Sequence, residues 1–424
     1  MLLARPALVR VPADLGAVTS DGPTTDADPR SLGVTRDGVA SIWRAVEDLY
    51  RTGVHPAIAL CIRRHGEIII NRAIGHLRGN GPGASPGTPA VPIAADSPFC
   101  IFSASKAVTA MLMHLLDDRG LTHIDDRVTE YIPEFGAHGK ETTTIRHILT
   151  HRSGIPSVSE AGDKLDLLLD PERIVEVLCA AEPTWKPGRR LAYHAVTGGF
   201  VLAEIIRRVT GRNVREFLRD EVLDPLGFRW MNYGIADEDA DKVAENAFTG
   251  RPALFPLSLV VERALGVTFA EAAQVSNDPR WLRGIVPSGN ICATAEEVSR
   301  FYQLLLDEGA LGDVRIFDRR TVHRATSEAS YLEIDLTLGL PIRYGLGMML
   351  GSEHFSLYGP RTPRAFGHIG LSQVVTWADP DRDIACALLT SGKPFVGAHL
   401  IRTYGVLQAI SEHCAPVPRR PART

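Results

Sequence analysis

The sequence predicts an α+β fold, in which an antiparallel sheet flanked by terminal helices forms an α/β lobe and carries an inserted, mostly helical lobe. An amphipathic helix at 37–50 precedes two β-runs at 57–62 and 67–73. The middle of the 424-residue chain is rich in helical patterns, and its last third returns to strands and a closing helix at 397–410. Because both ends supply strands and a helix, the simplest arrangement joins them in one sheet.

Apolar spacing and capping signals predict the remaining elements in order. The middle block contains helical patterns at 106–119, 144–150, 171–181, 198–209 and 213–223. The stretch 235–285 is irregular and contains one further helix at 257–265. Thr294 and Glu297 form a capping box at the start of a helix at 294–306. Three strands follow at 344–350, 373–378 and 384–389.

These elements divide the chain into two domains, one of them built from two separate segments. The sheet domain is expected to comprise 36–95 and 290–412, and the helical domain to comprise 96–289 and to carry the reactive residues. Residues 1–35 and 413–424 have no periodic pattern and are expected to be tails.

Composition excludes several classes of protein. The chain is 45% hydrophobic and 23% charged with a net charge of -4, which argues against a disordered chain and a nucleic-acid partner. Its six cysteines are scattered, and Cys61 and Cys386 lie in apolar runs typical of a core. Arg5 and Arg10 interrupt the N-terminal apolar residues, and no apolar run is long enough to span a membrane. We therefore expect a cytoplasmic protein, and the sequence leaves its oligomeric state open.

Ser103 and Lys106, in Phe-Ser-Ala-Ser-Lys at 102–106, are the strongest candidates for chemistry. The two residues are three positions apart at the start of an apolar helix, so their side chains share one face. A serine nucleophile needs a neighbouring base, and a buried amine can lose its proton whereas a guanidinium cannot. Only six of the 46 basic residues are lysine, and chance supplies about 0.4 such Ser-x-x-Lys matches. The motif alone is therefore weak evidence for a catalytic serine, and further motifs are needed to support it.

Further motifs follow in an order that resembles the serine β-lactamase and penicillin-binding protein superfamily, and within it class C β-lactamases and family VIII carboxylesterases. The resemblance covers roughly 38–412 and implies a β-lactamase-like fold. Its motifs are Ser103-x-x-Lys106, 144–155, Pro-Gly at 187–188, Tyr-His-Ala at 193–195, 198–204, 287–297 and Phe-Gly-His-Ile-Gly at 366–370.

The resemblance also implies roles for individual residues. Tyr193 would share proton transfer with Lys106, and the backbone N–H groups of Ser103 and Leu371 would form an oxyanion hole. Gly370 would let the strand approach the substrate closely. His368 would orient the acyl group or the Tyr193 hydroxyl, or only support the strand.

Departures from the superfamily pattern favour one substrate class. Ala195 stands where Tyr-x-Asn has its amide, and His368-Ile369 replace the Lys-Thr of Lys-Thr-Gly. A cation and a hydroxyl would bind the carboxylate of a β-lactam or a peptide, so their loss favours a small uncharged ester. We therefore expect a serine carboxylesterase that works without a cofactor or metal.

Alternatives remain open at this point. The same residues are compatible with an acyltransferase, with a β-lactamase or D-peptidase, or with a catalytically idle relative that only binds a ligand. His147 and His151 lack the neighbouring Glu of a zinc protease and are expected to be structural. The loops 235–285 and 351–364 are expected to line the entrance to the site.

Overall fold

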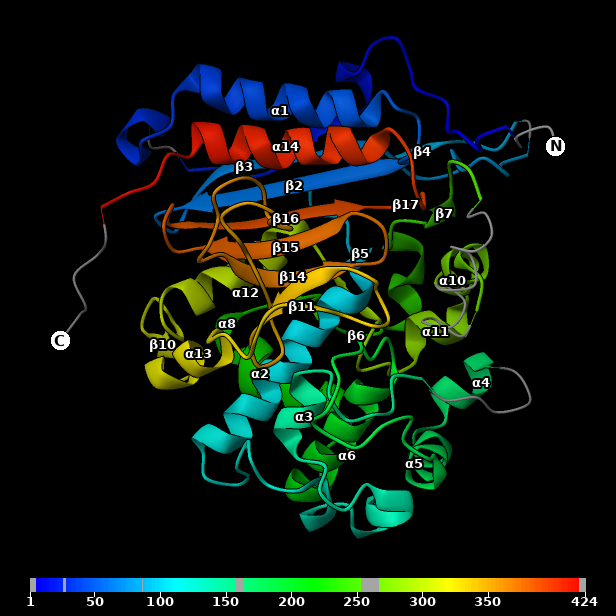
Figure 1. The fold of residues 1–424 in the computed structure, drawn as a ribbon. Coiled ribbons are helices and arrows are strands. Elements are labelled where there is room, and N and C mark those ends of the chain that lie inside the picture. The colour runs from blue at the N-terminus through cyan, green and yellow to red at the C-terminus, as the bar shows by residue number, and fades with distance from the viewer. Residues whose placement is uncertain (1–4, 26–27, 86, 158–163, 253–266, 419–424) are drawn as a thin grey trace.

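A single large sheet forms the centre of the protein. The structure is a computed structural model, and it describes residues 5–25, 28–85, 87–157, 164–252 and 267–418. Within that part of the chain, ten strands pair antiparallel in the order β1-β3-β2-β16-β15-β14-β13-β12-β11, with β4 beside β3 (Figure 1). Their bounds are β1 Thr19–Asp21, β2 Ala57–Arg64, β3 Glu67–Arg78, β4 Val91–Pro92, β11 Ser330–Ile334, β12 Pro341–Tyr344, β13 Met349–Leu350, β14 Phe366–Gly370, β15 Val374–Asp379 and β16 Ile384–Thr390.

Helices cover both faces of this sheet, as the predicted α+β fold requires. The terminal helices α1 (Arg36–Tyr50) and α14 (His399–His413) lie side by side on one face (Figure 1). Helix α12 (Ala295–Leu306) packs on the opposite face, against β2, β15 and β16. The sheet is thus assembled from both ends of the chain, with the helical region between them in sequence.

Side-chain size explains how the central strands fit between these layers. In β2 the small residues Ala57, Ala59 and Cys61 join the core on the α12 side, whereas Ile58 and Leu60 join the core under α1 and α14. Small side chains let α12 approach closely, and the large ones fill the wider space under the terminal helices. Cys61 and Cys386 are fully buried and unbridged, as their apolar surroundings predicted.

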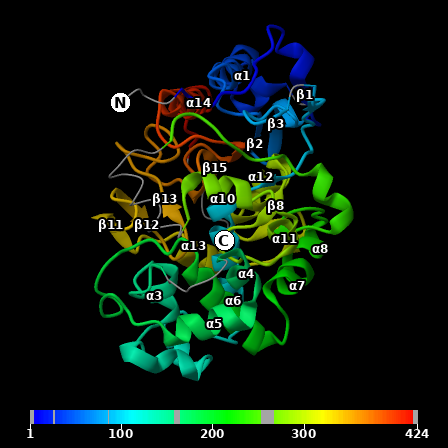
Figure 2. The same ribbon diagram turned by 90° about the vertical axis from the view of Figure 1, so that its right-hand side faces the viewer.

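The helical region lies beside the sheet and contains α2, which carries Lys106 of the Ser-x-x-Lys motif (Figures 1 and 2). Its helices and those that follow are α2 Ser105–Asp118, α3 Ile145–Leu149, α4 Lys164–Leu169, α5 Pro171–Ala180, α6 Thr197–Thr210, α7 Val214–Leu218, α8 Asp224–Leu226, α10 Phe269–Val275, α11 Pro279–Arg283 and α13 Arg319–Ala325. A π-helical turn at Arg219–Leu223 links α7 to α8, so the helix predicted at 213–223 changes its geometry part-way.

Three small sheets lie outside the large one. The strands β5 (Phe99–Cys100), β8 (Ile291–Ala293) and β6 (Asn232–Tyr233) form one of them, and β5 leads directly into the turn before α2. The strand β17 (Gly392–Lys393) pairs in parallel with β7 (Ala247–Phe248) just before α14. The third contains β9 (Ala310–Leu311) and β10 (Val314–Arg315).

Some sequence predictions differ from the structure. The single strand predicted at 344–350 is wrong: β12 and β13 are separate antiparallel strands. Gly347 lies between them with φ +95°, and a Cβ there would collide with Ala110 of α2. The predicted tail contributes the edge strand β1, which pairs with β3. The helix predicted at 257–265 lies outside the described residues, and the domain boundaries stay a prediction.

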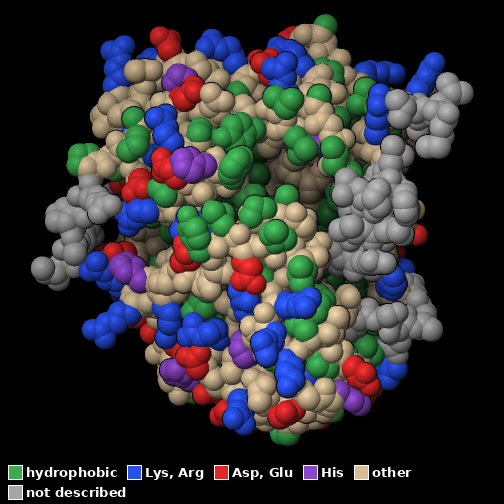
Figure 3. Space-filling model, in the orientation of Figure 1, with side chains coloured by type: hydrophobic (Ala, Val, Ile, Leu, Met, Phe, Trp, Pro, Cys, Tyr) green, Lys and Arg blue, Asp and Glu red, His purple; other side chains and the backbone are tan. Residues whose placement is uncertain are grey.

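The surface is mixed in character. Hydrophobic side chains gather around a hollow in the upper half of the face drawn in Figure 3, and charged side chains are frequent over the helical region below it. None of the helices that the structure describes is both long enough and apolar enough to cross a lipid bilayer.

Candidate active site

Ser103 lies in a tight turn between β5 and α2. The chain leaves β5 with the Ile101 N–H donating to the Ile291 carbonyl at 2.9 Å, then makes a 3₁₀ turn at Phe102–Ala104. Phe102 has a left-handed backbone with φ +48°. This turn places Ser103 at the N-terminal end of α2, where backbone N–H groups are not used within the helix. The sequence therefore sets the nucleophile candidate beside the positive end of a long helix.

Lys106, one turn further on, directs its amine at Ser103. The Nζ lies 3.1 Å from the Ser103 Oγ, 2.7 Å from the Ala195 carbonyl oxygen and 3.0 Å from the Ser288 carbonyl oxygen. Burial lowers the pKa of Lys106 from 10.5 to about 7. A neutral amine has two N–H donors and one lone pair, so two carbonyls can take the donors and leave the lone pair for the Ser103 hydroxyl.

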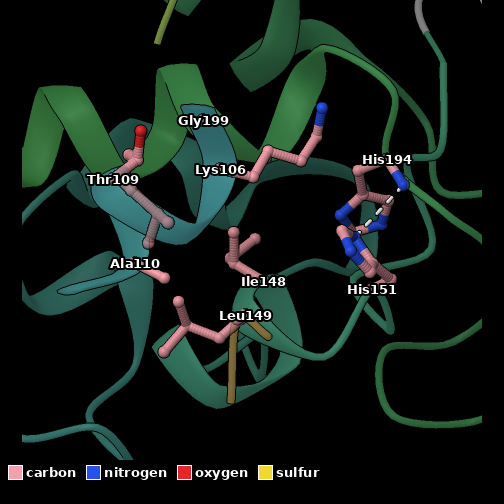
Figure 4. A pocket seen from close by; sticks show the side chains of 11 residues that line it. Lys106, Thr109, Ala110, Ile148, Leu149, His151, His194 and Gly199 are labelled. Atoms are coloured by element: carbon pink, nitrogen blue, oxygen red, sulfur yellow. Dashed lines mark hydrogen bonds between the residues drawn. The ribbon is translucent and has the colours of Figure 1, made fainter. Parts of the chain in front are cut away.

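A small apolar cavity lies under the stem of Lys106. It measures about 30 Å³. In Figure 4, Ile148, Leu149 and Ala110 border this space, while His151 and His194 lie together on its far side. No charged side chain besides Lys106 lines it. This low-dielectric surrounding explains why burial disfavours the charged ammonium.

Tyr193 completes the group around Ser103. The Lys106 Nζ lies 4.9 Å from the centroid of the Tyr193 ring, and the Tyr193 hydroxyl interacts with the Ser103 side chain. Burial raises the pKa of this tyrosine above its ordinary value of 10, and the interaction with Ser103 opposes that shift. At neutral pH Tyr193 is therefore protonated, which makes it a proton donor and leaves Lys106 as the base.

A buried carboxylate, which the sequence did not indicate, fixes Tyr193. Asp335 is completely buried, and its Oδ1 accepts the Tyr193 backbone N–H at 3.0 Å. The same oxygen accepts the N–H groups of Thr337 and Leu338, and its Oδ2 accepts the Tyr344 hydroxyl at 3.0 Å. A single Asp in the segment between two predicted elements has no motif that could have revealed it.

Asp335→Ala is expected to destabilise the protein by about 3 kcal/mol or more, because it leaves several buried donors without their charged acceptor. The free energy of unfolding in urea measures the effect. Asp166→Ala is the control, since Asp166 is exposed and bonds only to exposed Arg280; it should cost less than about 0.5 kcal/mol. Equal costs for the two variants would contradict a structural role for Asp335.

His151 also lies closer to the site than its sequence pattern suggested. Its ring is 4.7 Å from that of Tyr193 and 5.1 Å from that of Tyr344, measured between centroids. Its Nδ1 accepts the backbone N–H of His194 at 3.2 Å, the bond drawn in Figure 4. His147 caps α3 by accepting the Thr144 N–H. Within the described ranges, no three His, Cys, Asp or Glu side chains are grouped closely enough to hold a metal ion.

The strand β14 passes the nucleophile turn at close range. A Cβ on Gly370 would collide with the carbonyl oxygen of Ile101, so glycine is needed for this approach. His368 is buried with its ring centroid 6.1 Å from that of Tyr193, and its Nδ1 lies 2.7 Å from the Ile369 carbonyl oxygen. Burial lowers the pKa of His368 to about 3, with a further contribution from Lys106. His368 is thus a neutral imidazole and supplies no positive charge.

An apolar pocket opens beside Ser103. It encloses about 110 Å³ and brings Ser103 and Leu371 together on its wall. Its other lining residues are mostly apolar: Phe102, Leu165, Leu168, Ala195, Val196, Val267, Ala272, Val275, Trp281, Val286, Ser288 and Gly289, with Lys164 also present. Ala195 therefore contributes a methyl group where an amide would have made the wall polar.

Only one of the two loops expected at the entrance lines this pocket. The stretch 235–285 contributes residues of α10 and α11, and also Val267, which lies two positions before α10. None of the residues 351–364, all of which the structure describes, is among the lining residues. Tyr358 explains the difference, because it is buried, stacks on Trp377 and donates its hydroxyl to the Met349 carbonyl. These contacts hold the loop over the α14 face of the sheet.

Comparisons with known proteins agree with this arrangement. Residues 43–410 match the family described as Beta-lactamase. The chain is 30% identical over 423 residues to the esterase/beta-lactamase LipL of Mycobacterium tuberculosis, covering 93% of each protein. A family VIII carboxylesterase structure is 25% identical with a TM-score of 0.76, covering 90% of this chain and 99% of that one. A penicillin-binding protein homologue from Caulobacter crescentus has the same TM-score and coverage at 27% identity.

The family match spans most of the chain, and the similarity to LipL extends over nearly the full length of both proteins. The sheet with its terminal helices and the inserted helical region has the same fold as the solved relatives. The chain belongs to the beta-lactamase family, within the serine hydrolase superfamily whose members include esterases.

Proposed function

We propose that the protein is a serine carboxylesterase that cleaves small carboxylic esters through an acyl-enzyme on Ser103. The observation that carries this proposal is the Lys106 amine 3.1 Å from the Oγ of Ser103, which lies on the wall of an apolar pocket. The amine's lowered pKa lets it act as a base at neutral pH. The printed names of LipL and of the family VIII structure support an esterase.

Each step of the proposed reaction uses a group placed near Ser103. The Ser103 Oγ attacks the ester carbonyl while Lys106 takes its proton, and the N–H groups of Ser103 and Leu371 hold the oxyanion. Tyr193, protonated because burial raises its pKa, then gives a proton to the leaving alkoxide. Water releases the acyl group by the reverse sequence of proton transfers.

The electrostatics of β14 support an uncharged ester over a β-lactam or a peptide. A carboxylate on the substrate would need a cation and a hydroxyl where this chain has neutral His368 and apolar Ile369. The apolar pocket instead suits a hydrocarbon acyl or alcohol group.

Intact-mass measurement tests the proposal directly. The protein is mixed with p-nitrophenyl esters of increasing acyl length and, separately, with nitrocefin. We expect the mass of an acyl group to appear on Ser103 with the esters, and ester turnover to exceed nitrocefin turnover. Nitrocefin turnover that rivals ester turnover would show a β-lactamase instead. Ester product formed from an added alcohol in preference to free acid would show an acyltransferase.

The activity is expected to rise with pH through a midpoint near 7. Burial disfavours the charged Lys106, so the amine is half neutral at about pH 7 and protonated below it. The value of kcat/KM for p-nitrophenyl acetate should therefore fall about tenfold per pH unit on the acid side and level off above pH 8. The Ser103→Ala variant provides the blank for spontaneous hydrolysis. A midpoint near 10, the ordinary value for a lysine, would contradict the lowered pKa of Lys106.

A further inference from the structure

Two turns with left-handed backbone flank the pocket wall that holds Ser103 and Leu371. Phe102, immediately before Ser103, has φ +48°. Ser372 and Gln373, immediately after Leu371, have φ +51° and +70° and complete the three-residue turn 371–373 between β14 and β15. None of the three is glycine, the residue that tolerates this region. Such conformations persist only where surrounding contacts fix them, and they cluster at functional sites.

The contacts to the second turn come from residues 390–403, which we name the C-terminal brace. The brace runs from the end of β16 through β17 into the first turns of α14. Thr390 donates its hydroxyl to the Ser372 carbonyl at 3.2 Å, and the Ser372 hydroxyl donates to the Pro394 carbonyl. The Thr403 hydroxyl lies 2.8 Å from the Gln373 Oε1 and 3.1 Å from the His399 carbonyl oxygen of its own helix, so its proton has the shorter path to Gln373. Both strained residues of this turn are therefore tied to the brace.

A second group outside the brace shares the same amide oxygen. The His55 Nε2 lies 2.7 Å from the Gln373 Oε1, and His55 is completely buried just before β2. Burial lowers the pKa of His55 to about 3, so the imidazole is neutral and its Nε2–H donates to the amide oxygen. Gln373 is thus held from two elements that are far apart in the sequence.

The first turn also meets the brace. Lys393, in β17, is completely buried, and its Nζ lies 4.6 Å from the centroid of the Phe102 ring. The same Nζ donates to the Thr390 carbonyl at 2.6 Å, which fixes its position. Lys393 therefore packs against the side chain of the residue that precedes the nucleophile.

We propose that the C-terminal brace positions the oxyanion hole, with Thr403 holding the turn that presents the Leu371 N–H and Lys393 holding the turn that presents the Ser103 N–H. This inference rests on the proposed acyl-enzyme function. Lys393 and Thr403 are positioning residues, because no residue of 390–403 lines the pocket beside Ser103.

Oxyanion stabilisation is sensitive to such positioning. The donors act through fixed dipoles aimed at the developing charge, and a displacement of about 1 Å can cost roughly 100-fold in rate. If the Ser372–Gln373 turn relaxes, the peptide plane carrying the adjacent Leu371 N–H rotates with it. The substrate pocket itself is unchanged, so binding of the ground state should be largely preserved.

Thr403→Val tests this inference, because it removes the hydroxyl that contacts Gln373 and the His399 carbonyl and keeps the side-chain shape. We expect kcat for p-nitrophenyl acetate to fall about tenfold while KM stays within twofold. Thr403→Ser restores the donor and should return kcat to within twofold of the original protein. A Val variant whose kcat stays within twofold, or a Ser variant that is as slow as the Val variant, would overturn the inference.

Lys393→Met provides a second, independent arm. It should slow phosphonylation of Ser103 by a fluorophosphonate about tenfold, since that adduct also places an oxygen in the hole. Lys140→Met is its control, because Lys140 is likewise buried and bonds to two carbonyls, those of Cys179 and Ala181. Equal labelling rates in the two variants would overturn the role of Lys393. Failure of the unaltered protein to form any adduct would instead overturn the proposed function.

Discussion

Ser103→Ala is expected to lower kcat for p-nitrophenyl esters by about 10⁴-fold or more and to abolish the acyl mass increase. The hydroxyl is the group that forms the covalent bond, and nothing else in the turn replaces it, because Ala104 follows and the pocket wall is apolar. Serine hydrolases that lose the nucleophile keep only the part of catalysis due to binding and the oxyanion hole. Steady-state rates and intact mass measure the two effects.

Ser105→Ala is the matched control for this change. Ser105 lies two residues further on, and its Oγ accepts the Ile291 N–H at 3.1 Å inside the core. Its loss leaves a buried donor unpaired and should cost about 1–3 kcal/mol in unfolding free energy. The folded variant should still acquire the acyl group. Acylation of the Ser103→Ala variant, or no acylation of the folded Ser105→Ala variant, would show that Ser103 is not the nucleophile.

Lys106→Met is expected to lower kcat/KM about 10³-fold, in the range that positioned bases contribute. Methionine retains the length and apolar stem of lysine but has no amine to take the Ser103 proton. The remaining activity should also lose the rising limb that Lys106 produces near pH 7, since its amine is gone. A variant that keeps this limb would show that another group acts as the base.

Lys140→Met separates the loss of a base from the loss of a buried amine. Lys140 donates to the carbonyls of Cys179 and Ala181, as Lys106 donates to those of Ala195 and Ser288, but it has no serine beside it. The two variants should lose similar unfolding free energy in urea. Only Lys106→Met should lose activity, and an equal loss in both would mean that Lys106 acts only through stability.

Local patterns in the sequence predicted most of the elements near the site. The apolar run of β2, the apolar helix after Ser103 and the capping box at Thr294 are local features, so a short window of residues contains the information. The strand predicted at 344–350 failed because the turn within it depends on Ala110 of α2, which lies far away in the sequence. The edge strand β1 was missed because three residues are too few for a periodic pattern.

The residues of the candidate site also fall into two groups, those that the sequence indicated and those that only the fold reveals. Scarce lysine and ordered motifs pointed to Ser103, Lys106, Tyr193, His368, Gly370 and Leu371, and the structure places these residues around one pocket wall or beside it. Asp335, His151 and the residues of the C-terminal brace have no local signal, because each acts through a partner that only the fold brings near.

Spacing within one helix and the order of the motifs were enough to identify the family, the order of the elements and the lysine that faces a serine. The charge on the site, by contrast, depends on the folded surroundings. Burial from several distant segments makes Lys106 a base near pH 7, keeps Tyr193 protonated and leaves His368 neutral. The pKa of a side chain depends on what surrounds it in space, and no spacing along the chain contains that information.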